Sequence, residues 1–391
     1  MGDEMTRRQV RGDLTRTEIL ALLGAAGPLG RAEIAHRLGL GAATVTEHTR
    51  RLLAEGFLRE LPPRTSGTGR PRVPLQLVPD AAHVLGVRIA VDHLAGVVVG
   101  LDGQIVDEFR LPLRIADAPV PLLVETLLRE IDARRHTTPV RGIGVAVPGM
   151  TDPESGVVRL SGIMGWRELP LGRELARRLP VPVLVDNDLR ASTTAELLFG
   201  MGRERDDFLV LGIGDGLGLG VVLGRSVQCG ADGSSGEFGH LPVDPAGPRC
   251  TCGNRGCLQA LAGQSALVEQ ARRAGVSGLG EGLPGLVGAA ERGEPAVLAI
   301  LAEAGALLGR CVAGVVNVLA VKAVKVIGEG HVLWPFLGPS FEAAAAAGVI
   351  EPLRDPEITV APWRDIEHAR GAACLLLARG SSELKRFSSV D

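Results

Sequence analysis

The segment from Gly236 to Gln259 constrains this chain more than any other part of its sequence. It holds one histidine and three of the chain's six cysteines, and those cysteines lie within eight positions of one another. Thiolate sulfur and imidazole nitrogen are ligands that Zn²⁺ prefers, and four protein ligands complete the tetrahedral shell of a structural site. The predicted zinc ligands are His240, Cys250, Cys252 and Cys257.

Two disulfides or free buried thiols are the alternative interpretation of this cluster. Cys250 and Cys252 are too close in sequence to pair comfortably. Nothing in the sequence marks the chain as secreted, and disulfides belong to oxidising compartments. The loop between the ligands is rich in Gly and Pro, as tight folding around an ion requires. We therefore favour zinc.

The composition indicates a soluble globular protein. The chain has 391 residues, of which 46% are hydrophobic and 22% charged, which suggests two or three domains. Its N-terminus lacks the apolar run of a signal peptide. No run of 18 apolar residues is expected, because Asn317, Lys322 and Lys325 interrupt the longest candidate, Cys311–Ile327. We predict a cytoplasmic protein with no membrane contact.

Positive charge is concentrated at the N-terminus. Residues 1–80 carry 12 arginines and nine acidic residues, a net charge of +3, whereas the whole chain carries −3, so the remainder carries −6. A basic module on an acidic body predicts that nucleic acid binds at the N-terminus. Residues 1–80 are the predicted DNA-binding domain.

The pattern of these first 80 residues is typical of a winged helix-turn-helix. The apolar positions have helical spacing, Thr15 or Thr17 is a candidate N-cap, and a Gly-rich turn precedes the third helix. The expected helices span residues 15–25, 31–38 and 42–55, and the expected wing strands span residues 57–61 and 73–78.

The polar outer face of the third helix is the predicted recognition surface for a major groove. A solvated helical domain used for protein contacts is the alternative, and the low aromatic content of 3% argues against single-stranded nucleic acid. Thr44, Thr46 and His48 are predicted to lie near base edges, Arg50 and Arg51 to bind phosphates, and the wing residues Arg64, Arg70 and Arg72 to reach phosphate or a narrow minor groove.

From Val84 onward, strands alternate with helices, which indicates an α/β fold whose second half coarsely repeats the first. The expected strands span residues 84–99, 104–111, 141–147, 181–185, 208–213, 221–223 and 323–327, and the expected helices span residues 120–135, 171–179, 191–199, 297–318 and 366–379.

Three stretches of the body could carry chemistry. Asn187 and Asp188 are expected on a loop after a buried strand, where Asp188 could accept a proton from a sugar hydroxyl or cap the next helix. The Gly-rich residues 214–220 could bring backbone amides to a phosphate or only form a tight turn. Glu237 precedes His240 by three positions and could reach a polyol.

The pattern His-x9-Cys-x-Cys-Gly-x2-Gly-Cys, from His240 to Cys257, resembles the signature of the ROK family (repressors, open reading frames, kinases). The resemblance begins at about Thr15. It implies that residues 81–391 form an actin-like domain of two α/β lobes, with a sugar and nucleotide cleft between them. The implied lobes are about 81–187 and 188–391, with the C-terminal helix packing back on the first lobe.

The resemblance also implies a sugar site. The family's Asn-Asp pair matches Asn187 and Asp188, the latter being the base in the kinases, and its Glu and His match Glu237 and His240, the His binding zinc through its other nitrogen. Three positions depart from the family pattern. Gln259 stands where a Glu is usual and keeps hydrogen-bonding capacity without the charge, and Arg190 and Ile163 stand where the family has Asn.

The kinase machinery departs further. The family's phosphate loop Asp-x-Gly-Gly-Thr aligns with Arg88–Asp92, which lacks both glycines and carries an arginine where a metal-side carboxylate is expected. In the second loop, Asp215 replaces a Thr. Phosphoryl transfer requires a positioned and neutralised triphosphate. We therefore predict no enzyme activity, with Asp188 a vestigial base.

These observations predict a transcriptional regulator, a repressor, that binds a double-stranded DNA operator and responds to a sugar or sugar derivative. A homodimer or homotetramer would place two winged helices on a pseudo-palindromic operator. One alternative is an ATP-dependent sugar kinase with an accessory DNA-binding domain. Another is a regulator that responds to a partner protein or a phosphorylated metabolite.

Overall fold

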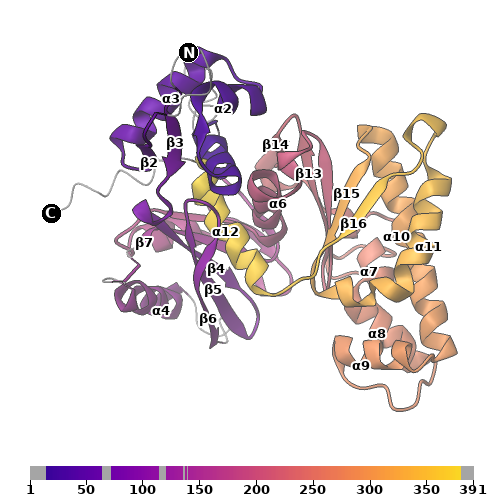
Figure 1. The fold of residues 1–391 in the computed structure, drawn as a ribbon. Coiled ribbons are helices and arrows are strands. Elements are labelled where there is room, and N and C mark those ends of the chain that lie inside the picture. The colour runs from indigo at the N-terminus through magenta and orange to yellow at the C-terminus, as the bar shows by residue number, and fades with distance from the viewer. Residues whose placement is uncertain (1–14, 64–71, 114–119, 135–136, 139, 380–391) are drawn as a thin grey trace. The chain divides into compact units, whose positions relative to one another are not determined.

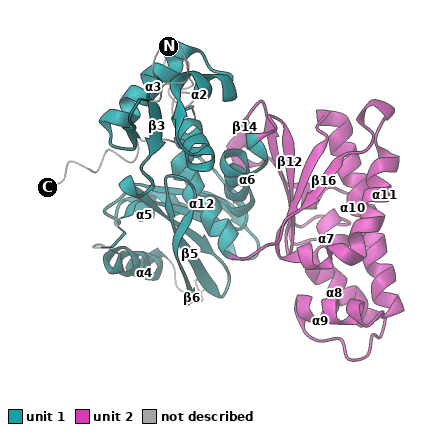
Figure 2. Ribbon diagram, in the orientation of Figure 1, with its two compact units in different colours: residues 1–203, 366–391 teal, residues 204–365 magenta. Residues whose placement is uncertain are grey.

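The computed structural model describes residues 15–63, 72–113, 120–134, 137–138 and 140–379. The chain forms two compact units: residues 1–203 with 366–391, and residues 204–365 (Figure 2). The division differs from the lobe boundary expected at 187/188. Helix α6 (Asp188–Phe199) packs against α12 (Ile366–Arg379), and this contact keeps α6 in the first unit.

The N-terminal part of the first unit is a winged helix-turn-helix, as predicted (Figure 1). A helix over residues 15–26 precedes α2 (Arg31–Arg37) and α3 (Ala42–Ala54). The wing strands β2 (Leu58–Glu60) and β3 (Pro74–Leu77) are antiparallel, and β3 also pairs with β1 (Leu29–Gly30), a two-residue strand that the sequence pattern did not reveal. The apolar core includes Ile19, Leu23, Ile34, Val45, Leu52 and Leu75.

The sheet of the first unit has the strand order β11-β7-β4-β5-β6. β4 pairs in parallel with β7, and β7 with β11, whereas β5 is antiparallel to both β4 and β6. The single strand expected over 84–99 is two strands, because the chain turns at 90–92, where Ala90 N donates to His93 O at 2.9 Å. The strands are β4 (His83–Ile89), β5 (His93–Gly100), β6 (Ile105–Pro112), β7 (Val140–Val147) and β11 (Val183–Asn187).

The two faces of this sheet are covered differently, because side chains alternate along a strand. Leu85 and Val87 pack in one apolar cluster with α4 (Val120–Ala133) and α5 (Leu171–Ala176). The opposite face presents Gly86 and its register partner Gly144 to α12. A Cβ at either position would lie 1.9 or 1.8 Å from a carbonyl oxygen of α12, so only glycine allows this approach.

A second, smaller sheet in the first unit, of order β10-β9-β8, was not predicted. Its strands are only two to four residues long, too short for a clear alternation of apolar and polar residues. They are β8 (Met150–Thr151), β9 (Val158–Ser161) and β10 (Trp166–Leu169), and the unit also contains the short helices η1 (Pro79–Ala81) and η3 (Met201–Arg203).

The second unit contains a sheet of order β14-β13-β12-β15-β16 with helices packed against it. β13 begins at Leu217, so the second half of the Gly-rich segment is strand and not loop. The strands are β12 (Phe208–Ile213), β13 (Leu217–Leu223), β14 (Ser226–Val227), β15 (Ala323–Ile327) and β16 (Glu357–Val360). The helices are η4 (Ala231–Gly233), η5 (Phe238–His240), α7 (Leu258–Ala262), α8 (Gln264–Arg273), α9 (Gly282–Glu291), α10 (Pro295–Leu319), η6 (Glu329–Leu333), α11 (Trp334–Gly348) and η7 (Glu351–Leu353).

Helix α10 matches the long helix expected over residues 297–318, and its apolar sequence is interrupted by Glu303 and Arg310. It is the one helix in the described part of the chain that is long and apolar enough to cross a membrane. Leu301 and Leu308 of α10 are fully buried in the core of the second unit. A Cβ on Gly305 would lie 2.1 Å from Leu337 O of α11. These contacts are those of a core helix.

Gly144→Ala tests the contact between α12 and the sheet. The added methyl group would force apart two packed backbones, so the free energy of unfolding should fall by about 1–3 kcal/mol. Gly162→Ala is the control, because an added Cβ at Gly162 meets nothing within 4 Å. Chemical denaturation of both variants measures the difference, and equal stabilities would contradict the packing described here.

Candidate functional site

The four predicted zinc ligands lie together in the second unit. One ligand atom from each of them falls within 4.8 Å of all the others. Cys250 Sγ is 3.4 Å from His240 Nδ1, and Cys252 Sγ is 3.7 Å from Cys257 Sγ. Metal bonds of the usual length would set the edges of a tetrahedral site at about 3.6–3.8 Å. The spacing therefore fits a four-ligand metal ion.

A tightly folded loop brings these residues together. His240 ends η5, Cys257 immediately precedes α7, and Pro242 forms an isolated β-bridge with Cys257. Gly256 has a φ of +62°, and a Cβ there would lie 1.4 Å from Asp244 O. Only glycine can occupy that position, which explains a glycine next to the last cysteine.

The protonation state of the thiols also affects how well these four residues suit a metal ion. Burial, and then contacts with Cys252 and Cys250, raise the pKa of the Cys257 thiol to about 12. Burial also acts to raise the pKa of Cys252, but hydrogen bonds from the Asn254 backbone and the neighbouring thiols outweigh it, and that pKa lies below its ordinary value. Closely spaced thiolates repel one another, and a divalent cation between them removes that repulsion. The donor set therefore suits a metal.

The other nitrogen of His240 faces Glu237, with 3.7 Å between His240 Nε2 and Glu237 Oε2. The imidazole thus links the cysteine cluster to a carboxylate that is 42% exposed. Gln259 lies close by on α7, and its Oε1 accepts a hydrogen bond from Leu217 N of β13 at 3.2 Å. This bond orients the Gln259 amide, whose NH₂ group could donate to a hydroxyl.

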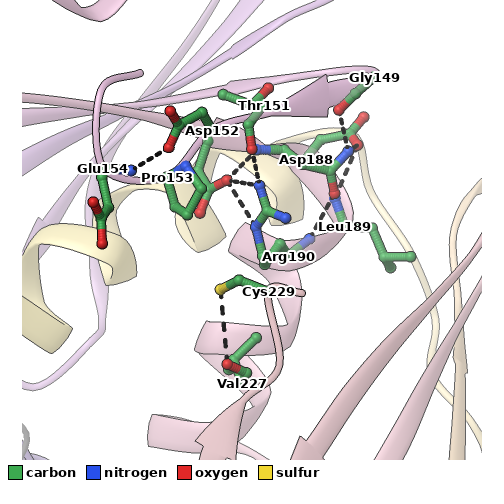
Figure 3. Close-up of polar contacts among 12 residues, drawn as sticks. Gly149, Thr151, Asp152, Pro153, Glu154, Asp188, Leu189, Arg190, Val227 and Cys229 are labelled. Atoms are coloured by element: carbon green, nitrogen blue, oxygen red, sulfur yellow. Dashed lines mark hydrogen bonds and ion pairs between the residues drawn. The ribbon is translucent and has the colours of Figure 1, made fainter. Parts of the chain in front are cut away.

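Asn187 and Asp188 do not lie on a loop: Asn187 ends β11 and Asp188 begins α6. Asn187 Oδ1 accepts from Arg190 N at 2.9 Å, so Asn187, and not Asp188, caps the helix. Asn187 Nδ2 donates to Gly149 O at 2.9 Å, and Asp188 Oδ1 accepts from Leu189 N at 2.8 Å (Figure 3). The Asn-Asp pair is thus held in one conformation at the junction of strand and helix.

Arg190, one of the departures noted above, has a defined structural role. Its side chain is buried and forms an ion pair with Asp186, with Nε 2.8 Å from Asp186 Oδ1. It also donates to Thr151 O at 2.6 Å (Figure 3). Its charge is therefore balanced inside the first unit. Sequence reasoning missed this pair, although opposite charges at i and i+4 were a signal for it.

The segment that aligns with the family's first phosphate loop, Arg88–Asp92, forms the end of β4 and the turn to β5 and contains no glycine. Arg88 is a residue of β4, paired with Ala95 of β5 and Ala146 of β7. Asp92 lies in the following tight turn, where its Oδ1 is 2.6 Å from His93 Nδ1. A strand end and a tight turn leave no glycine loop whose amides could approach a phosphate.

Carboxylates surround the second Gly-rich loop. Asp215 N donates to Glu329 Oε1 at 3.4 Å, and Asp215 Oδ1 accepts from Ser265 Oγ at 3.0 Å. An added Cβ on Gly214 would lie 2.4 Å from Glu329 Oε1. A backbone amide that could meet a phosphate therefore meets the Glu329 carboxylate, and the local charge is unfavourable for a triphosphate.

The recognition helix α3 presents most of the predicted DNA contacts. Thr44, Thr46, Arg50 and Arg51 are exposed, and Arg51 pairs with Glu47 at 2.6 Å. His48 differs from the expectation, because it is half-buried, and burial followed by the charge of Arg16 lowers its pKa. Its ring is therefore neutral near pH 7. In the wing, Arg72 is exposed, whereas Arg64 and Arg70 lie outside the described residues.

Comparisons with known proteins place these features in a family. The ROK family profile matches residues 84–379, and a winged helix-turn-helix DNA-binding profile matches residues 13–59. The chain is 29% identical to the xylose repressor of Bacillus subtilis (strain 168) over 273 residues, 69% of this chain and 70% of that repressor. It is 26% identical to the DNA-binding transcriptional dual regulator NagC of Escherichia coli (strain K12) over 373 residues, 93% of this chain and 92% of NagC.

Solved structures agree with these relatives. A crystal structure described as a ROK family transcriptional regulator, homolog of the E. coli MLC protein, has a TM-score of 0.81 and 25% identity, and covers 97% of this chain and 99% of that one. A ROK family glucokinase from Streptomyces griseus, in complex with glucose and AMPPNP, has a TM-score of 0.64 and 26% identity, and covers 75% of this chain and 98% of that one. These matches confirm a winged helix-turn-helix followed by a ROK sugar-kinase fold. NagC and the homolog of the MLC protein, which match 93% and 97% of this chain, are transcriptional regulators. The chain belongs to the ROK family, among its DNA-binding transcriptional regulators.

Proposed function

We propose that this protein is a cytoplasmic repressor that binds a double-stranded operator and changes its affinity for that operator when a sugar or sugar derivative binds to its ROK domain. The observation that carries the proposal is the contrast between the Asn187–Asp188 junction and the second phosphate loop. The Asn187–Asp188 pair keeps an ordered arrangement, whereas Glu329 occupies the amide side of the second phosphate loop. A chain of this kind can recognise hydroxyls but is poorly suited to holding a triphosphate.

In this proposal, Asp188, Glu237 and His240 bind sugar hydroxyls, with Asn187 and Gln259 in supporting roles. Carboxylates accept strong hydrogen bonds from hydroxyl groups, which favours Asp188 and Glu237 as the primary contacts. Asn187 acts mainly on the protein, because its side chain already caps α6 and binds Gly149 O. The xylose repressor named above and a further relative, the N-acetylglucosamine repressor of Escherichia coli O6:H1, which is 26% identical over 373 residues, carry sugars in their names, and this supports a carbohydrate as the effector class.

We propose Zn²⁺ as the metal of the cysteine cluster, held by His240, Cys250, Cys252 and Cys257. A bound zinc ion would supply a fixed cross-link within the loop. His240 would be fixed through Nδ1 while Nε2 stays directed at Glu237, so the orientation of the proposed sugar contacts would depend on the cluster.

On DNA, α3 would enter the major groove. Arg50 and Arg51 would bind phosphates, Thr44 and Thr46 would lie near base edges, and the wing arginines would reach the adjacent backbone. His48, being half-buried and neutral, would contribute a hydrogen bond and no charge. A homodimer or homotetramer would bring two such helices to a pseudo-palindromic site.

Asp188→Asn tests the sugar-binding function. Calorimetric titration of the full chain with D-xylose, D-glucose and N-acetyl-D-glucosamine should show that at least one of them binds. Loss of the charged acceptor should weaken that sugar at least about tenfold. Thr193→Val is the control, because Thr193 bonds within α6 to Leu189 O. Phosphorylation of any of these sugars from ATP, lost in Asp188→Asn, would instead establish a kinase.

Cys252→Ser tests the zinc proposal. The purified protein should contain about one zinc atom per chain, and the variant should bind zinc at least about tenfold more weakly and unfold at a lower temperature. Cys229→Ser makes the same change outside the cluster and should retain the metal. Elemental analysis and thermal unfolding with and without a chelator provide the measurements. Equal zinc content in the two variants would disprove the ligand assignment.

Arg50→Ala tests the docking of α3. The full-length protein would select its operator from a library of random duplexes. The variant should bind that operator more weakly, and the slope of log K against log salt should fall by about one, because one phosphate contact is lost. Arg37→Ala is the control, since Arg37 pairs with Glu33 on α2 at 2.6 Å. An unchanged slope in Arg50→Ala would exclude this orientation.

A further inference from the structure

Helix α12 contacts the first turn of α6, where Asp188 lies. His368 Nδ1 is 2.9 Å from Ser192 Oγ and 3.3 Å from Asp188 O, and Ser192 Oγ donates to Asp188 O at 3.0 Å. Because the hydroxyl proton is directed to Asp188 O, the imidazole Nδ1–H is the donor to Ser192. Burial, and then the charge of Arg88, hold the pKa of His368 well below its ordinary value, so the ring stays neutral.

The middle of α12 is locked to its neighbours by close backbone contacts. Gly86 and Gly144 let α12 lie directly on β4 and β7. Gly371 does the same towards α6, because a Cβ there would lie 2.6 Å from the backbone of Ala191. At these glycines backbone packs directly on backbone, and there is no side chain whose rotamer could change to absorb a small movement. A displacement of the first turn of α6 is therefore passed to α12.

The other end of α12 holds the DNA-binding domain. Thr17, a candidate N-cap in the sequence analysis, instead donates its hydroxyl proton to Leu377 O in the last turn of α12. Carbonyls in the last turn of a helix have no partner within that helix, so this bond satisfies one of them. Leu376 and Leu377 also belong to the same apolar cluster as Ile19, Leu20 and Leu23 of the first helix.

We propose that α12 transmits effector binding from the first turn of α6 to the winged helix-turn-helix, with His368 and Ser192 as positioning residues at one end and the Thr17–Leu377 contact at the other. This inference rests on the proposed function, in which Asp188 binds the effector. An effector changes operator affinity only if it favours one arrangement of α6 over another. The contacts of α12 then carry that preference to the helix over residues 15–26 and so to α3.

Hydrogen exchange of the full-length protein tests the proposal without any effector. Ser192→Ala removes the hydroxyl that contacts His368, and exchange in residues 15–26 should become about three- to tenfold faster, the effect of losing one hydrogen bond. Thr193→Val is the matched control, because Thr193 makes the same kind of bond to a carbonyl of α6 at Leu189 O. It should leave residues 15–26 unchanged.

The reverse substitution separates coupling from local loosening, because coupling between two sites is reciprocal. Thr17→Val should accelerate hydrogen exchange in residues 188–192 by a similar factor. If Ser192→Ala fails to fold, this variant alone shows whether the two regions are coupled. The inference is overturned if Thr17→Val leaves residues 188–192 unchanged, or if Ser192→Ala and Thr193→Val have equal effects on residues 15–26.

The sugar titration keeps the two proposals distinguishable. If none of the three sugars binds, the proposed effector class fails, whereas the exchange measurements still decide whether α6 and the DNA-binding domain are coupled. With a sugar that binds, Ser192→Ala should keep its sugar affinity within about threefold and lose most of the sugar's effect on operator binding. Retention of that effect would contradict the role of α12.

Discussion

The contact between α12 and the strands β4 and β7 determines how the rest of the first unit is arranged. Gly86 and Gly144 bring helix backbone and sheet backbone together with no side chains between them. Helix α12 therefore lies on the first sheet, beside α6 and against the helix over residues 15–26. Residues that are far apart in sequence become neighbours around one helix, and those neighbours include the proposed ligand contact and the DNA-binding domain.

The buried ion pair at the start of α6 specifies one local conformation but adds little to the free energy of unfolding. The Arg190–Asp186 pair lies in the interior, where the cost of removing two charges from water offsets much of their attraction. Removing one partner would leave the other charge uncompensated, so the pair fixes the junction of β11 and α6 strongly. Asn187 and Asp188 lie within this junction. Arg190, at a position where the resemblance to the family predicted asparagine, therefore stiffens this junction, and Asp186 balances its charge.

The sequence predicted those features that depend on local spacing. The four predicted metal ligands lie within 18 residues, and their side chains do meet. The helices of the DNA-binding domain follow from periodicity and glycine turns. Contacts between residues that are distant in sequence could not be predicted. Asp215 and Glu329 are 114 positions apart, and Ser192 and His368 are 176 positions apart. Helix α11 escaped prediction because Pro339 lies inside it and its apolar residues lack a clear period. The turn between β4 and β5 was missed, although Asp92 and His93 interrupt the apolar pattern at that point.

The two halves of the proposed mechanism differ in their physical basis. The proposed contacts of Arg50 and Arg51 with phosphates would be made in water, and salt would weaken them because counterions compete. The proposed path from Asp188 O through Ser192, His368 and α12 to Thr17 consists of neutral hydrogen bonds and apolar packing in the interior. Ionic strength screens such buried, uncharged contacts very little. In the proposed mechanism, salt therefore sets how tightly the operator is held, whereas packing around α12 sets how strongly an effector can change that affinity.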